Sequence, residues 1–158
     1  MSKIALTTDQ HYGKLLTKAW VEWMHKPGYI VDASVHWFVW LMENPASPIS
    51  FRGATRLQQH DYIHIILDKG MDVHDEAYVI GFCMGNASCR QCDWRFKWFL
   101  WIAKHLYPDG YKFDGHAEHG YHSGWDQGYK RFRRNIHKFN FPEDLTVEHA
   151  RDMWGIKV

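Results

Sequence analysis

The chain has 158 residues, a formal net charge of +1 and 23% charged residues. This length suits a single domain spanning residues 1–158, large enough to bury a core but too short for a second domain. The balanced charge does not demand a nucleic-acid partner, and we expect none. Nine tryptophans indicate either a core of large side chains or a surface that meets lipid headgroups.

The sequence pattern predicts neither a targeting segment nor a disulfide framework. The first residues, Met1–Thr8, lack a basic start followed by a long apolar core, and no apolar run reaches the length of a membrane span. Three cysteines, an odd number, argue against a disulfide framework. We therefore expect a cytoplasmic protein, with peripheral contact to a membrane as an addition to that location.

Two apolar helices are predicted before the first chemical motif. Apolar residues recur at helical spacing across Asp9–His25, which indicates an amphipathic helix facing the core. The segment Ile30–Glu43 is apolar on all sides, with Asp32 as a candidate cap, and we expect a buried central helix. Contact with lipid or with a second copy in a homodimer are the alternatives for its surplus apolar surface.

The helix predicted over Ala54–Leu67 contains the main constellation. His60 and His64 are four residues apart, so they share one helical face, and Asp61 lies on the adjoining flank. Imidazole and carboxylate groups at this spacing are suited to a divalent metal, although a helical histidine pair is by itself often structural.

Glu76 follows after a predicted break. Gly70 can end the first helix and Asp72 can cap a second one over Val73–Met84, with Asp75 at its third position. The resulting helix–turn–helix would fold Glu76 back towards the histidines. Two imidazoles and one or two carboxylates then form a metal site, for which zinc is preferred and iron is an option.

The region after this motif contains a weaker metal signal. Cys89-x-x-Cys92 lacks two fixed partners, although His116, His119 and His122 follow at intervals of three residues. Two thiols alone do not close a tetrahedral zinc site, so we expect Cys89 and Cys92 not to be ligands.

Three further helices complete the predicted all-α fold, a bundle of about six or seven helices. The helix Asp93–Tyr107 has more aromatic side chains than one buried stripe can hide, which predicts an apolar patch or tunnel beside it. A glycine- and histidine-rich loop is predicted over Gly115–Gly124, then a basic helix over Trp125–Lys138. Thr146 can cap a final short helix.

The spacing His60-Asp61-x-x-His64, then eleven residues, then Glu76 resembles the signature of the coenzyme Q (ubiquinone) biosynthesis protein 4 family. The similarity covers roughly residues 55–87 and 120–158, including Gly124-x-x-x-Gly128. It implies an all-helical fold in which His60, Asp61, His64 and Glu76 are the ligands of a divalent metal, usually zinc. Asp68 and Asp75 stand where the family often has glycine.

The resemblance also implies a function. Such a protein acts on, or presents, a prenylated quinone precursor or other lipid at a membrane surface, with oxidative decarboxylation of the ring as its reaction. The metal would polarise a ring oxygen or carboxylate, and Asp61 would ligate the metal or serve as the catalytic base. Two alternatives stay open. A closed four-ligand metal favours a non-catalytic scaffold or lipid-binding protein, and a polar cleft favours a metal-dependent hydrolase of an unrelated substrate.

Overall fold

The computed structural model describes residues 13–27, 29, 36–87, 94–131 and 135–158, and over these residues the fold is all-α, as predicted. The only β-type pairing in the described ranges is an isolated bridge between Leu15 and Thr146. The helices are α1 (Leu16–Met24), α2 (Trp37–Glu43), α3 (Leu57–Leu67), α4 (Val73–Ala87), α5 (Trp94–His105), α6 (Gly115–Tyr129), the 3-10 helix η3 (Ile136–Lys138) and α7 (Val147–Trp154).

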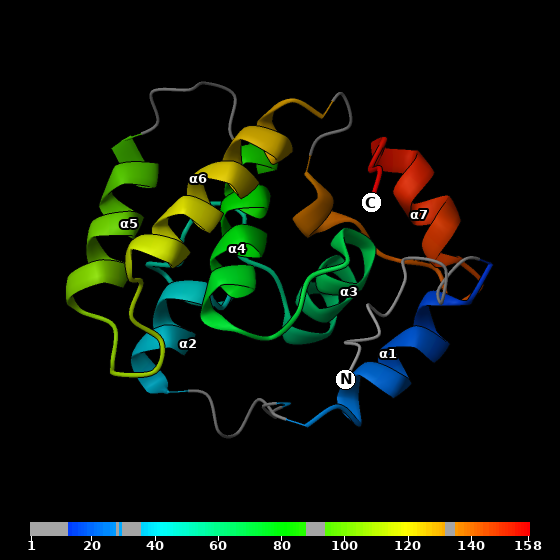
Figure 1. The fold of residues 1–158 in the computed structure, drawn as a ribbon, viewed down its shortest axis with the longest axis horizontal. Helices are drawn as coiled ribbons and strands as arrows, with labels where there is room; N and C mark the ends of the chain where they lie inside the picture. The colour runs from blue at the N-terminus through cyan, green and yellow to red at the C-terminus, as the bar shows by residue number, and fades with distance from the viewer. Residues whose placement is uncertain (1–12, 28, 30–35, 88–93, 132–134) are drawn as a thin grey trace, which may run out of the picture.

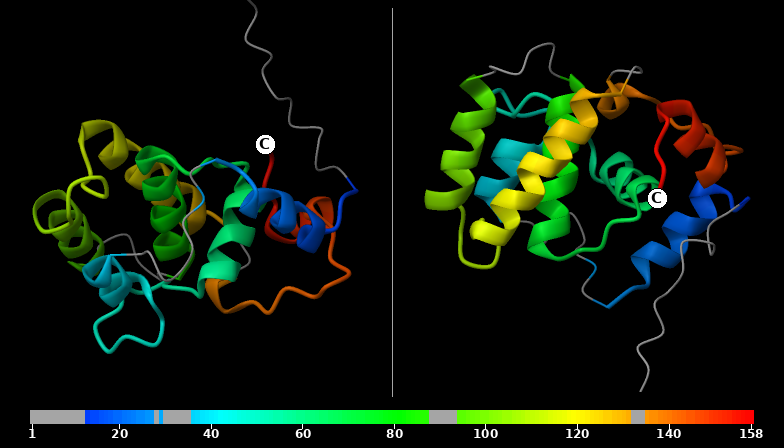
Figure 2. Two further views of the ribbon diagram at one scale, coloured as in Figure 1. Left: turned by 90° about the horizontal axis from the view of Figure 1, so that it is seen from below. Right: turned by 45° about the horizontal axis from the view of Figure 1, so that its top comes forward.

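Helix α4 lies at the middle of the molecule and contributes to both of its hydrophobic clusters (Figures 1 and 2). Val79 and Phe82 pack into the cluster formed with α1, α3 and α7. Ala77, Ile80 and Met84 pack into the second cluster, formed with α2, α5 and α6. A helix buried on most of its surface in this way is held firmly, so any side chain at its N-terminal end is well positioned.

Four glycines allow α4 and α6 to cross at backbone contact. A Cβ atom on Gly81 or Gly85 of α4 would coincide with a carbonyl oxygen of α6, and one on Gly124 or Gly128 of α6 would coincide with a carbonyl oxygen of α4. Gly81 and Gly85 thus let α4 approach α6 closely. The carbonyl oxygens belong to Tyr121, Trp125, Tyr78 and Phe82, respectively.

The prediction of a loop over Gly115–Gly124 was wrong. This segment is the first part of α6, which begins where the Asp114 side chain accepts a hydrogen bond from the Ala117 backbone N–H at 2.8 Å. Glycine lowers intrinsic helix propensity, but Gly120 and Gly124 are required by the close approach of α4, so tertiary packing outweighs propensity. The basic helix predicted over Trp125–Lys138 was also wrong, because α6 ends at Tyr129.

The helix predicted over Ile30–Glu43 is only partly buried where the structure describes it. Val39 and Met42 face the core, but Trp37 is 68% exposed and Trp40 is 41% exposed. The interpretation as a buried central helix is thus wrong for this part, and α4 takes that place. Asp32 lies outside the described residues. The side chain of His36 instead caps α2 by accepting from the Phe38 N–H.

The turn between α3 and α4 differs from the prediction at one position. Asp68, rather than Gly70, takes the left-handed conformation that ends α3, with φ of 55°. The Asp72 cap is confirmed, because its side chain accepts from the Asp75 N–H at 2.9 Å. The final cap is confirmed as well, since Thr146 accepts from the His149 N–H at 3.2 Å. In both caps, a side-chain oxygen accepts a hydrogen bond from a backbone N–H group of the first helical turn that has no partner within the helix.

Candidate metal centre

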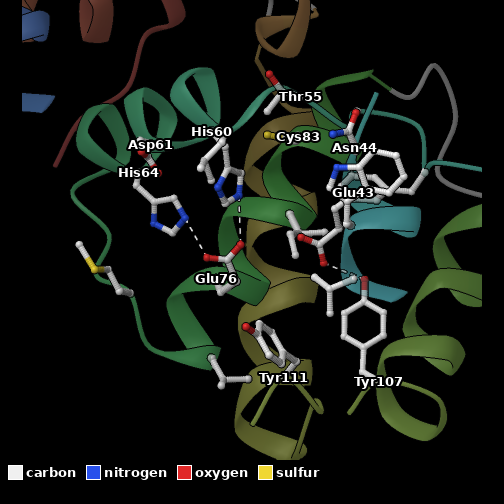
Figure 3. Close-up of a pocket in the computed structure, with 18 of the residues that line it drawn as sticks. Glu43, Asn44, Thr55, His60, Asp61, His64, Glu76, Cys83, Tyr107 and Tyr111 are labelled. Atoms are coloured by element: carbon white, nitrogen blue, oxygen red, sulfur yellow. Dashed lines mark hydrogen bonds and ion pairs between the residues drawn. The ribbon is translucent and has the colours of Figure 1, made fainter. Parts of the chain in front are cut away.

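Three of the predicted ligands meet where α3 faces the first turns of α4 (Figure 3). His60 Nε2 lies 3.1 Å from one carboxylate oxygen of Glu76, and His64 Nε2 lies 3.1 Å from the other. The ligand atoms of His60, His64 and Glu76 all lie within 4.8 Å of one another. The helix–turn–helix therefore brings Glu76 back to the histidine pair in the way that the sequence predicted.

The local sequence explains this convergence. One helical turn separates His60 from His64, and their ring centroids are 4.7 Å apart. The Asp72 cap starts α4 early enough for Glu76 to lie in its first turn, next to the end of α3. Because α4 is fixed by core packing along its length, the carboxylate of Glu76 has little freedom to move away.

The donor set fits a divalent cation. His60 Nε2 is buried and, despite its distance to Glu76, makes no aligned hydrogen bond. Burial lowers the pKa of His60, but its interactions with Glu76, Glu43 and Asp61 together outweigh burial and raise the pKa to about 9. Burial also acts to raise the pKa of Glu76, but the two histidines hold it well below its ordinary value. The histidines and the carboxylate thus favour positive charge between them, which a proton or a metal ion can supply.

His64 is held by packing. Its side chain is only 2% exposed, and its ring lies against Trp23 with 5.5 Å between centroids. The second ring nitrogen, Nδ1, is buried without a hydrogen-bond partner. The orientation of this imidazole therefore comes from its neighbours in the core and not from the hydrogen bond that commonly orients a histidine ligand.

Asp61 is buried but turned towards α1. Its Oδ2 accepts hydrogen bonds from Trp20 Nε1 and from the Tyr29 hydroxyl, both at 2.9 Å. Asp61 does not belong to the cluster of converging ligand atoms, although it lines the same cavity. The structure thus places this carboxylate beside the centre and gives one of its oxygens a role in joining α3 to the N-terminal part of the chain.

A cavity of about 350 Å³ adjoins the three ligands. Most of the side chains in its wall are apolar or aromatic. The polar ones include the three ligands, and Glu43 and Asn44 lie on another side of the cavity (Figure 3). The apolar part is formed mainly by Trp23, Tyr29, Val39, Trp40, Phe51, Leu57, Met71, Val73, Ile80, Tyr107, Tyr111 and Phe113. A pocket of this kind suits a largely apolar ligand that presents a few polar atoms to the cluster.

Glu43 is a polar residue of the cavity that the sequence did not predict. It lies at the end of α2, and its carboxyl group accepts a hydrogen bond from the Tyr107 hydroxyl at 2.7 Å. Burial and the nearby negative charge of Glu76 raise the pKa of Glu43 to about 7. The available signal was a lone carboxylate at the end of an otherwise apolar segment, which is uncommon unless the carboxylate has a partner.

The other candidate groups do not form a comparable centre. Asp72, His74 and Asp75 have ligand atoms within 4.8 Å of one another, but both carboxylates already accept backbone N–H groups: Asp72 from Asp75 in the first turn of α4, and Asp75 from Gly70 in the turn before it. His116 stacks on the His74 ring with 3.9 Å between centroids. Cys89 and Cys92 lie outside the described residues, so the expectation that they are not zinc ligands stays a prediction.

Comparison with known proteins returned no matching family model, no matching curated protein and no matching solved structure. The geometry of the centre and its cavity therefore has to support any assignment of function.

Proposed function

We propose that this chain is a divalent-metal protein that acts on a prenylated aromatic quinone precursor at a membrane surface. The observation that supports this most directly is the position of two imidazoles and one carboxylate at the wall of a mainly apolar cavity. A three-ligand set leaves coordination positions for a substrate or water, which is the arrangement of catalytic rather than structural zinc sites. Zinc is the preferred metal, and iron also suits two histidines and one carboxylate.

The chain's own residues have separate tasks in this proposal. His60, His64 and Glu76 hold the metal, which supplies Lewis-acid polarisation of a ring oxygen or carboxylate. The apolar wall binds the prenylated part and keeps water from the ring. Glu43, with Tyr107 donating to it, can hold a proton near neutral pH beside the bound ring. Asp61 remains a candidate ligand or base.

The proposed location is cytoplasmic and peripheral to a membrane. Within the described part of the chain, none of the helices combines the length and the apolar character needed to cross a bilayer. The exposed tryptophans of α2 and α5 support membrane contact, because indole rings are favoured at the boundary between headgroups and acyl chains.

The reaction implied by the sequence resemblance is oxidative removal of a ring carboxylate.

One alternative has its own supporting observation. Asp61 directly follows His60 in the sequence and lines the same cavity as the three ligands, and a fourth protein ligand would close the metal site. A closed site favours a non-catalytic scaffold that uses its metal for stability. The mainly apolar cavity, in contrast, does not favour a hydrolase of a soluble polar substrate.

The ligand assignment is tested with His64→Ala, for which we expect loss of the bound metal. Elemental analysis of protein purified without added metal should show about one equivalent for the wild type and a small fraction of that for the variant. His149→Ala is the matched control, because His149 is exposed on α7. Retention of a full equivalent by folded His64→Ala would refute the assignment.

The same measurement on Asp61→Asn separates the two roles of Asp61. Asparagine preserves an acceptor for Trp20 and Tyr29 but is a poor metal ligand. Undiminished metal content in this variant means that Asp61 positions α3, whereas loss of metal means that it closes the site. Mass spectrometry of lipid that co-purifies with the wild type then tests the proposed substrate class, and recovery of no prenylated compound would count against it.

A further inference from the structure

A second hollow, distinct from the metal centre, lies between the segment that precedes α3 and the 3-10 helix η3. It has a volume of about 500 Å³ and is open to solvent. Phe51, Gly53 and Thr55 contribute to both this hollow and the metal-centre cavity, so the two spaces are neighbours. Their chemistry differs, because the second hollow has basic and amide side chains where the first has acidic and apolar ones.

Three cations face this hollow without a described counter-ion. Arg52 and Arg56 come from the segment before α3, and Lys138 comes from η3. No residue in the described wall of the hollow is Asp or Glu, and no ion pair described in the structure involves any of the three cations. Elsewhere in the described part of the chain some lysines do have a carboxylate partner, as Lys104 has Glu118 and Lys130 has Asp126. Collecting like charges is unfavourable unless an anion offsets their repulsion.

His137 adds a buried polar group to the same wall. It is 9% exposed, and its Nδ1 is buried with no hydrogen-bond partner. Burial, together with the positive charges of Lys138 and Arg52, lowers its pKa to about 4. The ring is therefore neutral at pH 7, and a bound anion would offset the two positive charges that disfavour its protonation.

The N-terminus of α3 lies at the same place. Arg56 is the N-cap residue, and its side chain makes no capping hydrogen bond. An eleven-residue helix that begins without a side-chain cap leaves N–H groups of its first turn for another acceptor, and its dipole favours a negative charge there. Helix end, unpaired cations and unpartnered histidine are three separate observations, and all of them concern one hollow.

We propose that this hollow binds a phosphate-class anion, either a free phosphate compound or the phosphate of a lipid headgroup. Arg52, Arg56 and Lys138 supply the charge, while His137 and the start of α3 give the site its directionality. Guanidinium groups suit this ligand because they donate paired hydrogen bonds to phosphate oxygens. The proposal does not depend on the metal centre or on the function assigned to it.

The test measures binding of inorganic pyrophosphate by calorimetry at low ionic strength, using the full chain as purified. Arg52→Gln combined with Lys138→Gln should weaken binding about tenfold or more, because two charge-assisted contacts are lost. Lys18→Gln combined with Lys157→Gln removes the same charge from exposed positions outside the hollow and should have little effect. His64→Ala should bind as the wild type does, which separates this site from phosphate held by a metal.

A parallel arm identifies the source of the phosphate. Vesicles of phosphatidylcholine with phosphatidic acid replace pyrophosphate, and co-sedimentation is measured with the same four proteins. Binding in either arm that depends on Arg52 and Lys138 supports the proposal, and the stronger arm names the source. If neither probe binds, the proposal is wrong. It is also wrong if the control double variant weakens binding equally, because general charge attraction then explains the binding without a specific site.

Discussion

Glu43 and Tyr107 form a hydrogen-bonded pair within the cavity, at a distance of 2.7 Å. The pKa of Glu43 in the folded protein is about 7, raised from 4.5 by burial and by Glu76. Between these values the folded state binds more protons at this residue than the unfolded state does. The free energy of unfolding should therefore decline as the pH rises from about 4.5 to about 7.

The variant Glu43→Gln tests this linkage, because glutamine keeps an acceptor for Tyr107 and carries no charge. In metal-free protein we expect it to raise the free energy of unfolding by about 2 kcal/mol at pH 8 and to change it little below pH 4.5. Denaturant titrations across this pH range provide the measurement. Glu143→Gln is the control, since Glu143 is exposed. A gain that is independent of pH would show that the carboxyl group is not held protonated by its surroundings.

At the scale of the elements, the α4–α6 crossing should tolerate no added methyl group. Gly124→Ala would place a Cβ at the carbonyl oxygen of Tyr78, and backbone atoms cannot move aside as a flexible side chain can. We expect a loss of about 3 kcal/mol or more in the free energy of unfolding, despite the better helix propensity of alanine. Gly115→Ala in the same helix has open space around its Cβ and should be neutral or slightly stabilising. Thermal and denaturant unfolding of both variants make the comparison.

Helix α5 presents all three of its tryptophans to solvent. Trp94, Trp98 and Trp101 are exposed, and the rings of Trp98 and Trp101 stack with 5.4 Å between centroids. The apolar patch predicted beside this helix is thus present, but the cavity lies nearer α3 and α4, with Tyr107 as its contact to the end of α5. Lys104, near the end of the same helix, pairs with Glu118.

If this surface meets a membrane, Trp98→Glu combined with Trp101→Glu should reduce co-sedimentation with phosphatidylcholine vesicles about tenfold or more. Uncharged vesicles keep this test separate from any effect of the basic hollow. Val21→Glu combined with Ile49→Glu is the matched control, as both residues are exposed apolar positions outside α5. Circular dichroism confirms folding. A folded wild type that ignores vesicles would leave subunit contact as the explanation for these aromatic residues.

At the scale of the whole molecule, the features predicted well were those determined within a few residues. The His60–His64 pairing, the Asp72 cap and the return of Glu76 depend on helix geometry over about one turn each, and the structure shows all three. The class of fold followed from helical periodicity. Such features can be derived because neighbours in the sequence are also neighbours in space.

The errors arose where distant segments decide the outcome. The sequence of Gly115–Gly124 is typical of a loop, and it forms a helix because α4 packs against it. The raised pKa of Glu43 depends on its burial and on Glu76, and its hydrogen bond depends on Tyr107, all of which are set by the tertiary fold. Trp37 is a large apolar residue of a kind often found in a core. However, α4 occupies the centre of the molecule, and the Trp37 side chain is exposed. Hydrophobic periodicity does not indicate which of several apolar helices becomes central, because that depends on how all of the helices pack together.

The contact between Trp23 and His64 gives the protein its own optical probe. Most of the large hydrophobic side chains that are exposed are tryptophans, and their fluorescence should lie at the red edge of the emission spectrum. Trp23 is 4% exposed and should emit further to the blue. Its ring centroid is only 5.5 Å from that of a proposed ligand. An open-shell ion such as Co²⁺ bound at the three ligands would quench the Trp23 share of the blue-edge fluorescence. Trp125 and Trp154, which are also buried, would keep their share of it, and most of the red-edge emission would stay unchanged. Occupancy of the centre can thus be followed in solution without a label.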